Sequence, residues 1–293
     1  MNSRISTFVI QSVSMNQSLV VIVPVYKVLN KSEIQSIESL NKLESQSDLN
    51  VCLVGSDFFV QLNNNRLSSV LNSFITLKNE SFDEECFKDV VSYNRLLLSN
   101  EFYQRFKSYE YMLIFQTDAF IIKDSLDVFI DMGYTYIGAP WLVADVPEKI
   151  GLSVGNGGFS LRHIPSFIKA LKLNLTISDS LWKLYHPANN WKRRLFKLFV
   201  YLPAQFLSKI QGRSFFFEKA KYNWMNEDVV WSQFIQDHKE YTLSSLEDAL
   251  MFSFETMPRE CYRLNNNQLP FGCHALEKYD PQFWKSHIPL LNS

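Results

Sequence analysis

The apolar stretch Leu19-Val20-Val21-Ile22-Val23-Pro24-Val25 decides the fold. It is short, rich in β-branched residues and apolar at every position, which is typical of a strand buried on both faces in a parallel sheet. Pro24 fits only near the end of such a strand, because proline donates no hydrogen bond to a neighbouring strand. A helix capped by Asn30 or Ser32 is predicted to follow. Its apolar residues recur at helical spacing: Ile34, Ile37, Leu40 and Leu43.

Strands and helices continue to alternate beyond this first strand. Residues 50–54 and 111–115 predict two more buried strands, with a shorter one at residues 74–77. Helices are expected around residues 67–71 and over residues 91–107, where apolar side chains again recur at helical spacing. This order predicts an α/β fold of the Rossmann type, with a mostly parallel sheet flanked by helices.

The pattern changes after residue 118. The expected elements are a strand at 134–137, a glycine-rich loop at 151–158, a strand at 159–161 and helices at 165–173 and 227–238. Between the last two helices, residues 192–221 hold eight Lys or Arg against one Glu, a net charge of +7. We find neither an internal repeat nor a linker. The sequence therefore predicts one compact domain, residues 1–293, with an inserted basic helical segment over residues 179–221.

Composition excludes several classes of protein. A hydrophobic fraction of 46% and a net charge of -1 do not fit a disordered chain. The glycine motifs of P-loop kinases and Rossmann dehydrogenases are missing. A pI near 6.5, without a recognition motif, predicts no nucleic-acid partner. Four widely spaced cysteines, no signal-peptide pattern and no apolar run of about 18 residues predict a cytoplasmic protein.

Two aspartates follow predicted strands and are candidates for binding a ligand. Asp57 comes after the strand at 50–54, and Asp118 after the strand at 111–115. Ligands of open α/β sheets bind beyond the carboxyl ends of the strands. A carboxylate at that position can hold a ribose hydroxyl, or a divalent metal together with its diphosphate. A turn or a helix N-cap is the other interpretation of each aspartate.

Two further segments carry polar groups suited to chemistry. The loop Gly155-Asn156-Gly157-Gly158 lets the backbone approach a ligand closely, and Asn156 offers both a donor and an acceptor. A bulged hairpin turn is the alternative interpretation of this loop. Glu227 and Asp228 open the helix predicted at 227–238. They either complement the helix dipole or include a general base that takes a proton from a hydroxyl.

Four landmarks of the sequence occur in the order found in GT-A nucleotide-sugar glycosyltransferases. The class has a D-x-D-like strand end, a glycine loop, an acidic helix start and a C-terminal histidine. The matching segments are Gln116-Thr117-Asp118, Gly155 to Gly158, Glu227-Asp228 and His274. Val23-Pro24-Val25-Tyr26 is similar to the first strand of these enzymes, beside the nucleotide base. The chain thus resembles the GT-A class over residues 19–275.

The chain more closely resembles an uncharacterised, glycosyltransferase-like bacterial domain family found in surface-polysaccharide gene clusters. The resemblance implies a nucleotide-binding half over residues 19–120 and an acceptor or catalytic half over residues 134–275. Four motifs carry it: Tyr93-Asn94-Arg95, Gln116-Thr117-Asp118-Ala119-Phe120, Tyr136-Ile137-Gly138-Ala139-Pro140-Trp141 and Asn156-Gly157-Gly158-Phe159-Ser160-Leu161-Arg162.

The resemblance to glycosyltransferases implies a role for each candidate residue. Asp228 deprotonates the acceptor hydroxyl, and Glu227 orients the donor or the acceptor. Asp118 and His274 hold a divalent metal, Mn²⁺ or Mg²⁺, on the diphosphate. The residues expected to bind the nucleotide or the donor sugar are Pro24, Val25, Tyr26, Asp57, Asn94, Arg95, Gln116, Thr117, Asp118, Asn156, Gly157 and Gly158.

One residue departs from the pattern of the class, because Gln116 stands where D-x-D has its first acid. An amide oxygen can still bind a hard cation, but it adds no charge. This departure leaves metal dependence open. It also keeps a second hypothesis, a catalytically silent nucleotide- or sugar-binding module. A two-metal phosphodiesterase would need more His and Asp ligands than these motifs offer.

The implied activity is the transfer of a sugar from a nucleotide-sugar donor, with a UDP-sugar favoured. The acceptor would be a hydroxyl of a polysaccharide or of a lipid-linked glycan in bacterial capsule or O-antigen biosynthesis. An inverting reaction is favoured, because only inversion uses Asp228 as a base. If the enzyme retains configuration, that role lapses.

The basic segment at residues 192–221 has three interpretations. Lys192, Arg193 and Arg194 are followed by Phe196 and Phe199, so charged and aromatic side chains are interleaved. Such a mixture fits an interfacial helix at an anionic bilayer, here the cytoplasmic face of the inner membrane. It equally fits a cradle for a diphosphate-bearing acceptor, or a solvated helix.

Overall fold

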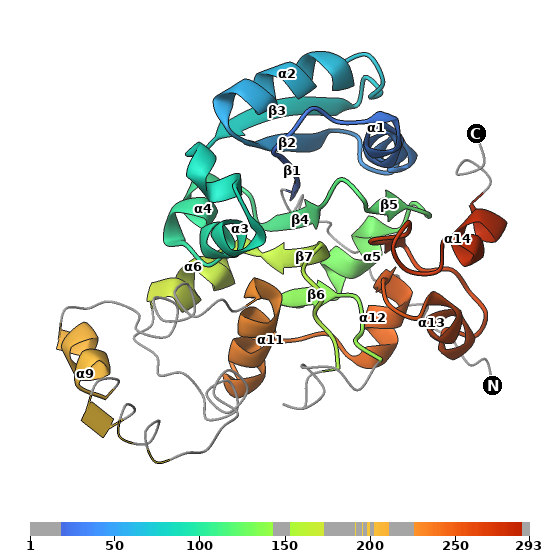
Figure 1. Cartoon of the computed structure of the whole chain (residues 1–293). Coiled ribbons are helices and arrows are strands. Elements are labelled where there is room, and N and C mark those ends of the chain that lie inside the picture. The colour runs from blue at the N-terminus through green and yellow to red at the C-terminus, as the bar shows by residue number, and fades with distance from the viewer. Residues whose placement is uncertain are drawn as a thin grey trace, which may run out of the picture.

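The computed structural model describes the chain from the first predicted strand to the last helix, with gaps. The described residues are 19–142, 153–172, 191, 195, 198–199, 202–210 and 226–288. Six strands form the central sheet: β1 (Leu19–Val25), β2 (Leu49–Gly55), β3 (Ile75–Ser81), β4 (Tyr111–Phe115), β6 (Tyr136–Gly138) and β7 (Phe159–His163). Their order across the sheet is β3-β2-β1-β4-β7-β6 (Figure 1).

The sheet is mostly parallel, as predicted. β1 pairs in parallel with β2 on one side and with β4 on the other, and β2 pairs in parallel with β3. β7 runs antiparallel to both of its neighbours, β4 and β6. The α/β fold class expected from the sequence is therefore confirmed.

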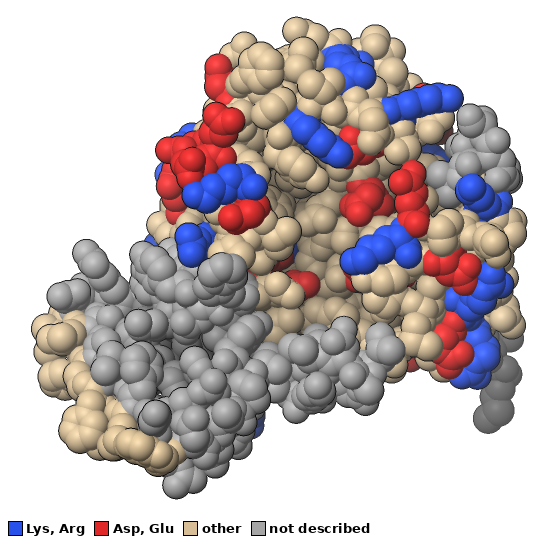
Figure 2. Space-filling view, in the orientation of Figure 1, with Lys and Arg blue, Asp and Glu red and all other residues tan. Residues whose placement is uncertain are grey.

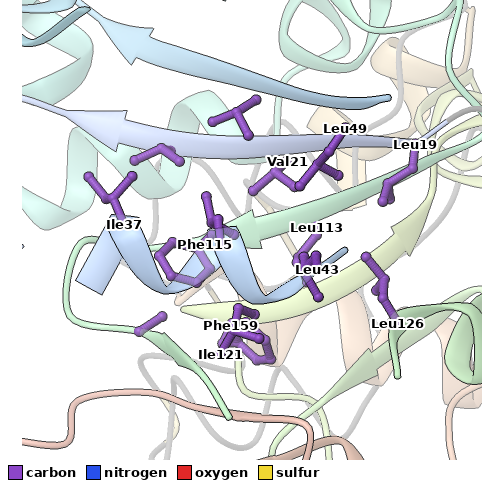
Figure 3. Close-up of a cluster of buried hydrophobic side chains, with 14 of the residues drawn as sticks. Leu19, Val21, Ile37, Leu43, Leu49, Leu113, Phe115, Ile121, Leu126 and Phe159 are labelled. Carbon is purple, nitrogen blue, oxygen red and sulfur yellow. The ribbon is translucent and has the colours of Figure 1, made fainter. Parts of the chain in front are cut away.

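Both faces of β1 are buried, as its unbroken apolar sequence predicts. Val20 and Ile22 point into one hydrophobic cluster, and Val21 and Val23 into the other. Figure 3 shows the second cluster, in which Phe115 of the sheet lies toward Ile37 and Leu113 lies beside Leu43. Alternation along a strand sends successive side chains to opposite faces, so an apolar strand needs cover on both sides.

Helices provide that cover. Apolar residues of α1 (Lys31–Glu38), α2 (Asp57–Leu67), α5 (Leu126–Asp131) and α12 (Leu246–Phe252) belong to the cluster with Val21. Apolar residues of α3 (Val90–Leu97), α4 (Asn100–Arg105), α6 (Ile164–Lys172) and α11 (Glu227–Asp237) belong to the cluster with Val20. Figure 1 shows the two sets on opposite sides of the sheet.

Several element boundaries differ from the sequence predictions. The helix expected over 91–107 is divided into α3 and α4, because the Ser99 hydroxyl accepts a hydrogen bond from the Phe102 amide and so starts a new helix. The helix expected around 67–71 lies earlier, as α2, and β3 extends to Ser81. The tail after residue 261, for which the sequence predicts no helix, carries one over Pro281–His287 (α14).

A small second sheet was not predicted. It contains β5 (Phe120–Ile121), β9 (Gly272–Cys273) and β8 (Ser253–Phe254) in that order, and α13 (Pro258–Leu264) connects β8 with the tail. β5 pairs with β9 antiparallel, with Phe120 opposite Cys273. This pairing places His274 next to Asp118, two residues before β5.

Most of the basic segment predicted at 192–221, and with it the inserted segment 179–221, lies outside the described residues. Within it, α9 (Leu202–Ile210) lies apart from the central sheet (Figure 1). The described large apolar side chains there are all exposed: Trp191, Leu195, Leu198, Phe199, Leu202, Phe206, Leu207 and Ile210. In the part of the chain that the structure describes, no helix has the length and apolarity needed to cross a membrane.

Candidate functional site

An open cavity of about 650 Å³ lies at the edge of the sheet where β1 and β4 end. After β1 the chain adds β2 and β3 on one side and then crosses to β4 on the other side of β1. Open α/β sheets bind ligands at such a reversal of strand order. Figure 2 shows a hollow on this face, with acidic and basic side chains around it. The lining residues are Pro24, Tyr26, Lys27, Glu33, Phe87, Lys88, Asp89, Val90, Tyr93, Asn94, Gln116, Thr117, Asp118, Asn156, Gly157, Gly158, Asn226, Glu227, Asp228 and His274.

Twelve of the fifteen residues singled out in the sequence line this one cavity. They come from the ends of β1 and β4, the loop before β7, α3, the start of α11 and the residue after β9. Three do not line it. Val25 is buried within β1, and Arg95 is an exposed residue of α3. Asp57 is exposed in the first turn of α2, where it accepts hydrogen bonds from Gln61 and Ser81.

His274 is held between two sets of oxygen atoms. Its Nε2 lies 3.1 Å from Asp118 Oδ1 and 3.1 Å from Gln116 Oε1 on the cavity side. Its Nδ1 lies 3.1 Å from Oε1 of Glu255, a carboxylate absent from the sequence predictions. Backbone bonds fix the ring further, because the His274 amide donates to Phe254 and the Ala275 amide donates to Asp118.

The pKa values of this group follow from these contacts. Burial alone lowers the pKa of His274, but its hydrogen bonds to Asp118 and Glu255 and the charges of both raise it to about 9. Burial raises the pKa of Asp118, yet the hydrogen bond and charge of His274 outweigh burial and hold it below its usual value. The Asp118 side chain is 51% exposed and open to a ligand.

These residues fit a divalent cation that is shared with a substrate. Among the residues that the structure describes, no three His, Cys, Asp or Glu side chains converge in a metal-binding cluster. Asp118, His274 and the amide oxygen of Gln116 do converge, as the 3.1 Å distances show. Mg²⁺ is commonly held by one or two carboxylates together with substrate phosphates, so an incomplete protein ligand set is typical of such sites.

The glycine loop fits tightly against the start of α11. The Gly157 amide donates to Asp228 Oδ2 at 3.2 Å, and a Cβ added to Gly157 would collide with Glu227. The Gly158 amide donates to Asn156 Oδ1 at 3.1 Å. Glycine is needed at residue 157 because a side chain there would collide with Glu227 and Asp228.

Glu227 is engaged in a buried ion pair. Arg162 of β7 donates two hydrogen bonds to its carboxylate, at 3.0 Å and 2.8 Å. The Arg162 side chain is fully buried and also donates to the Tyr103 hydroxyl. The Glu227 amide donates to Asn94 Oδ1 of α3 at 3.4 Å. Both charge and backbone of Glu227 are thus committed, which suits a residue that holds the site in shape.

Asp228, the second acidic residue of α11, has a raised pKa. Its side chain is half-buried, and it accepts hydrogen bonds from the amides of Val229 and Gly157. Burial raises its pKa, and the neighbouring charge of Glu227 adds to this effect, so the pKa is about 7. A carboxylate with this pKa can both take and release a proton near neutral pH.

Sequence reasoning missed several lining residues. Lys27 forms a 2.9 Å ion pair with Glu33, which also caps α1 together with Asn30. The sequence Asn30-x-x-Glu33 is a capping box, so this signal was readable. Lys88 and Asp89 line the opposite rim. No local pattern distinguishes these two from other exposed charges, and only the fold brings them to the cavity.

Comparison with known families assigns the chain. The family described as "Protein of unknown function (DUF5672)" matches residues 76–274. The chain belongs to the DUF5672 family. The match includes α3, Asp118, the glycine loop and Glu227-Asp228, and its last residue is His274. No curated protein matches the sequence.

Solved structures similar to this DUF5672 protein share little sequence with it. Mouse xyloside xylosyltransferase 1 in its apo form has a TM-score of 0.47 and 8% identity, covering 88% of this chain and 97% of its own. Galactosyltransferase LgtC, in complex with donor and acceptor sugar analogs, has a TM-score of 0.49 and 11% identity, covering 94% and 96%. Core-mannan synthase A from Aspergillus fumigatus, in its Mn/GDP form, has a TM-score of 0.40 and 9% identity, covering 76% and 71%.

Proposed function

We propose that this DUF5672 protein is a glycosyltransferase that moves a sugar from a nucleotide-sugar donor to an acceptor hydroxyl. One observation carries the proposal: a single cavity is lined by Asp118 and His274, which we propose bind a cation, and by Asp228, a carboxylate with a pKa of about 7. Transfer from a nucleotide sugar needs both, because a diphosphate must leave and a hydroxyl must lose its proton.

The donor is proposed to bind across the ends of β1 and β4. Pro24 and the exposed Tyr26, which line the cavity, are proposed to hold the nucleoside, and a UDP-sugar is the favoured donor. Asp118, Gln116 and His274 would hold Mn²⁺ or Mg²⁺ on the diphosphate. When bound, such an ion stabilises the negative charge of the leaving group as a Lewis acid.

The acceptor is proposed to enter beside Asp228. In this mechanism the carboxylate takes the proton of the acceptor hydroxyl as the oxygen attacks the anomeric carbon, which inverts the configuration. Gly157 donates to Asp228 and orients the base toward the cavity. Glu227, fixed by Arg162, keeps a second negative charge beside Asp228, and this charge helps to raise the pKa of the base.

The biological setting that we propose is the assembly of capsule or O-antigen on a glycan or lipid-linked acceptor in bacteria. The protein would be cytoplasmic, with peripheral contact to the inner membrane. The described part of the basic segment supports such contact, because Trp191, Phe199 and the large apolar residues of α9 are exposed. Each Lys or Arg near an anionic bilayer contributes about 1 kcal/mol of binding free energy, an attraction that salt weakens.

Sedimentation with anionic vesicles tests the membrane contact. The wild type is expected to sediment at low salt, and reversal of Lys192, Arg193 and Arg194 to Glu is expected to abolish binding while donor hydrolysis persists. A wild type that ignores vesicles, or a triple variant that loses donor hydrolysis, would contradict this part of the proposal.

Release of nucleoside diphosphate from a panel of nucleotide sugars tests the enzymatic proposal. One donor is expected to be turned over, slowly with water and faster with a suitable acceptor. Asp118→Asn should remove most of this activity, whereas Asp131→Asn, at an exposed position that ends α5, serves as the matched control. Binding of a nucleoside diphosphate without turnover of any donor would identify a silent binding module instead.

A further inference from the structure

Glu255 is a buried carboxylate directly behind His274. Glu255 follows β8 and His274 follows β9, and these strands pair in parallel with Phe254 opposite Cys273. Glu255 and His274 therefore lie side by side, each directly after the carboxyl end of its strand. Only 9% of the Glu255 side chain is exposed, and the residue does not line the cavity. Glu255 thus faces the cation-binding set from the far side of the imidazole ring.

This contact determines which nitrogen of His274 can give up its proton on the cavity side and bind a metal ion in its place. A carboxylate can only accept a hydrogen bond, so Nδ1 donates its proton to Glu255 at 3.1 Å. Nε2 then faces Asp118 Oδ1 and Gln116 Oε1, each 3.1 Å away. Three electron-rich atoms meet at one point, and only a positively charged species between them, a proton or a metal ion, makes that arrangement favourable.

We propose that Glu255 is a positioning residue that supplies, through His274, the negative charge that Gln116 lacks. The inference rests on the cation role proposed above for Asp118 and His274. A carboxylate on the far nitrogen fixes the ring and makes the near nitrogen a stronger ligand, and loss of such a partner typically costs about 10–100-fold in metal affinity. The cation site then has two carboxylates, one direct and one acting through the ring.

Two nearly isosteric substitutions separate charge from shape. Glu255→Gln removes the charge but keeps an oxygen that can accept the Nδ1 proton. Gln116→Glu places a carboxylate directly at the cation position, because Gln116 Oε1 is already 3.1 Å from Nε2. The measurement is the affinity for Mn²⁺ alone, without nucleotide or sugar, from the free-Mn²⁺ signal in electron paramagnetic resonance. Thermal unfolding without metal establishes that each variant is folded.

We expect Glu255→Gln to weaken Mn²⁺ binding about 10–100-fold and Gln116→Glu in the same chain to restore most of it. A purely structural role of Glu255 would give a loss that Gln116→Glu does not repair. The proposal is overturned by that result, by an affinity unchanged in Glu255→Gln, or by a wild type that does not bind Mn²⁺.

A measurement on the wild type keeps the proposal testable if Glu255→Gln does not fold. Long-range ¹H–¹⁵N spectra with Zn²⁺, a diamagnetic ion that binds imidazole nitrogen, should show the His274 proton on Nδ1. A proton on Nε2 under these conditions would contradict the assignment. Donor hydrolysis in EDTA, together with absent Mn²⁺ binding, would overturn this inference while leaving the glycosyltransferase proposal intact.

Discussion

Gly158 lies so close to the imidazole ring of His274 that a Cβ at residue 158 would overlap the ring. The carbonyl oxygen of Gly158 also accepts a hydrogen bond from the Gln116 amide, at 3.0 Å. One glycine thus sets the distance between the loop before β7, the end of β4 and the residue after β9. The geometry of the proposed cation-binding set depends on the missing side chain at residue 158.

Gly158→Ala should therefore damage the site more than the fold. The added methyl group has to displace His274, so we expect loss of most Mn²⁺ binding and donor turnover. Gly133→Ala is the control for steric overlap, because its Cβ would meet nothing within 4 Å. The φ of +68° at Gly133 disfavours alanine, so this control carries backbone strain that Gly158→Ala does not. The measurements are Mn²⁺ affinity and thermal unfolding. Unchanged Mn²⁺ affinity in Gly158→Ala would show that His274 does not bind the cation.

Arg162→Met should destabilise the protein strongly. It would leave the Glu227 carboxylate, only 4% exposed as a residue, without its partner. Breaking a buried ion pair in this way typically costs about 3–5 kcal/mol of unfolding free energy, whereas replacing both partners by apolar residues costs far less. Urea unfolding of Arg162→Met and of Arg162→Met with Glu227→Leu tests this. If the single and the double variant lose the same unfolding free energy, the unpaired Glu227 carboxylate is not the cause of the destabilisation.

Asp228→Asn should reduce kcat by about 10²–10⁴-fold while donor binding stays nearly unchanged, since an amide cannot accept the proton. Asp237→Asn is the matched control, because Asp237 is exposed at the other end of α11. Initial rates and donor affinity measure the two effects. If Glu227→Gln is the crippling change and Asp228→Asn is mild, the two acidic residues have exchanged roles.

The rate of transfer should rise with pH and level off above an apparent pKa of about 7. The base must be deprotonated to act, and burial together with the charge of Glu227 raises the pKa of Asp228 to about 7. The profile of kcat/KM against pH measures this value for the free enzyme. A rate that is already maximal at pH 5 would show that Asp228 is not the base.

The free energy of unfolding should fall as pH rises, whereas the rate of transfer should increase. Its pKa is about 7 in the folded protein and 3.8 ordinarily, so between these values the folded state binds more protons and stability falls as pH rises. One pKa unit corresponds to about 1.4 kcal/mol, so the cost above pH 7 is at most about 4 kcal/mol. Asp228→Asn should therefore gain stability over the wild type at pH 8 and lose that advantage near pH 4. If the difference between the urea midpoints of Asp228→Asn and the wild type is the same at pH 8 and at pH 4, this prediction is wrong.

The centre of the large sheet could be predicted because β1 and β4 are apolar at every position and β2 is apolar at most of them. The apolar composition of β1, β2 and β4 identifies them as buried strands. The polar residues that follow β1 and β4 line the same cavity, as expected for the carboxyl ends of neighbouring parallel strands. The division between α3 and α4 was missed, since Ser99 lies in an otherwise helical pattern and acts only through its side-chain cap. The spacing of apolar residues does not show that a side-chain hydroxyl will bind a backbone amide and start a new helix.

The partners of the site residues were harder to predict. Glu255 was missed because β8 and β9 are two residues long, too short to show any pattern, and because His274 is far from it in sequence. Arg162 did carry a signal. It is a charged residue in the strand Phe159–His163, whose first four residues are all buried, and a charge at such a position requires a buried partner. The sequence does not say which acid that partner is.

The small sheet also sets the order in which the protein can be completed during synthesis. All six strands of the large sheet lie within residues 19–163, so a nascent chain can build that framework early. His274, which contacts both Asp118 and Gln116, follows β9 and is synthesised much later than either of them. It is separated from Gln116 by 158 residues of sequence. Domains generally form as their chain emerges, and contacts that are distant in sequence form late. A ribosome-bound chain would therefore gain the proposed ability to capture a cation only after His274 has emerged, later than the whole of the large sheet, and cation capture would report on a step of folding that follows assembly of that sheet.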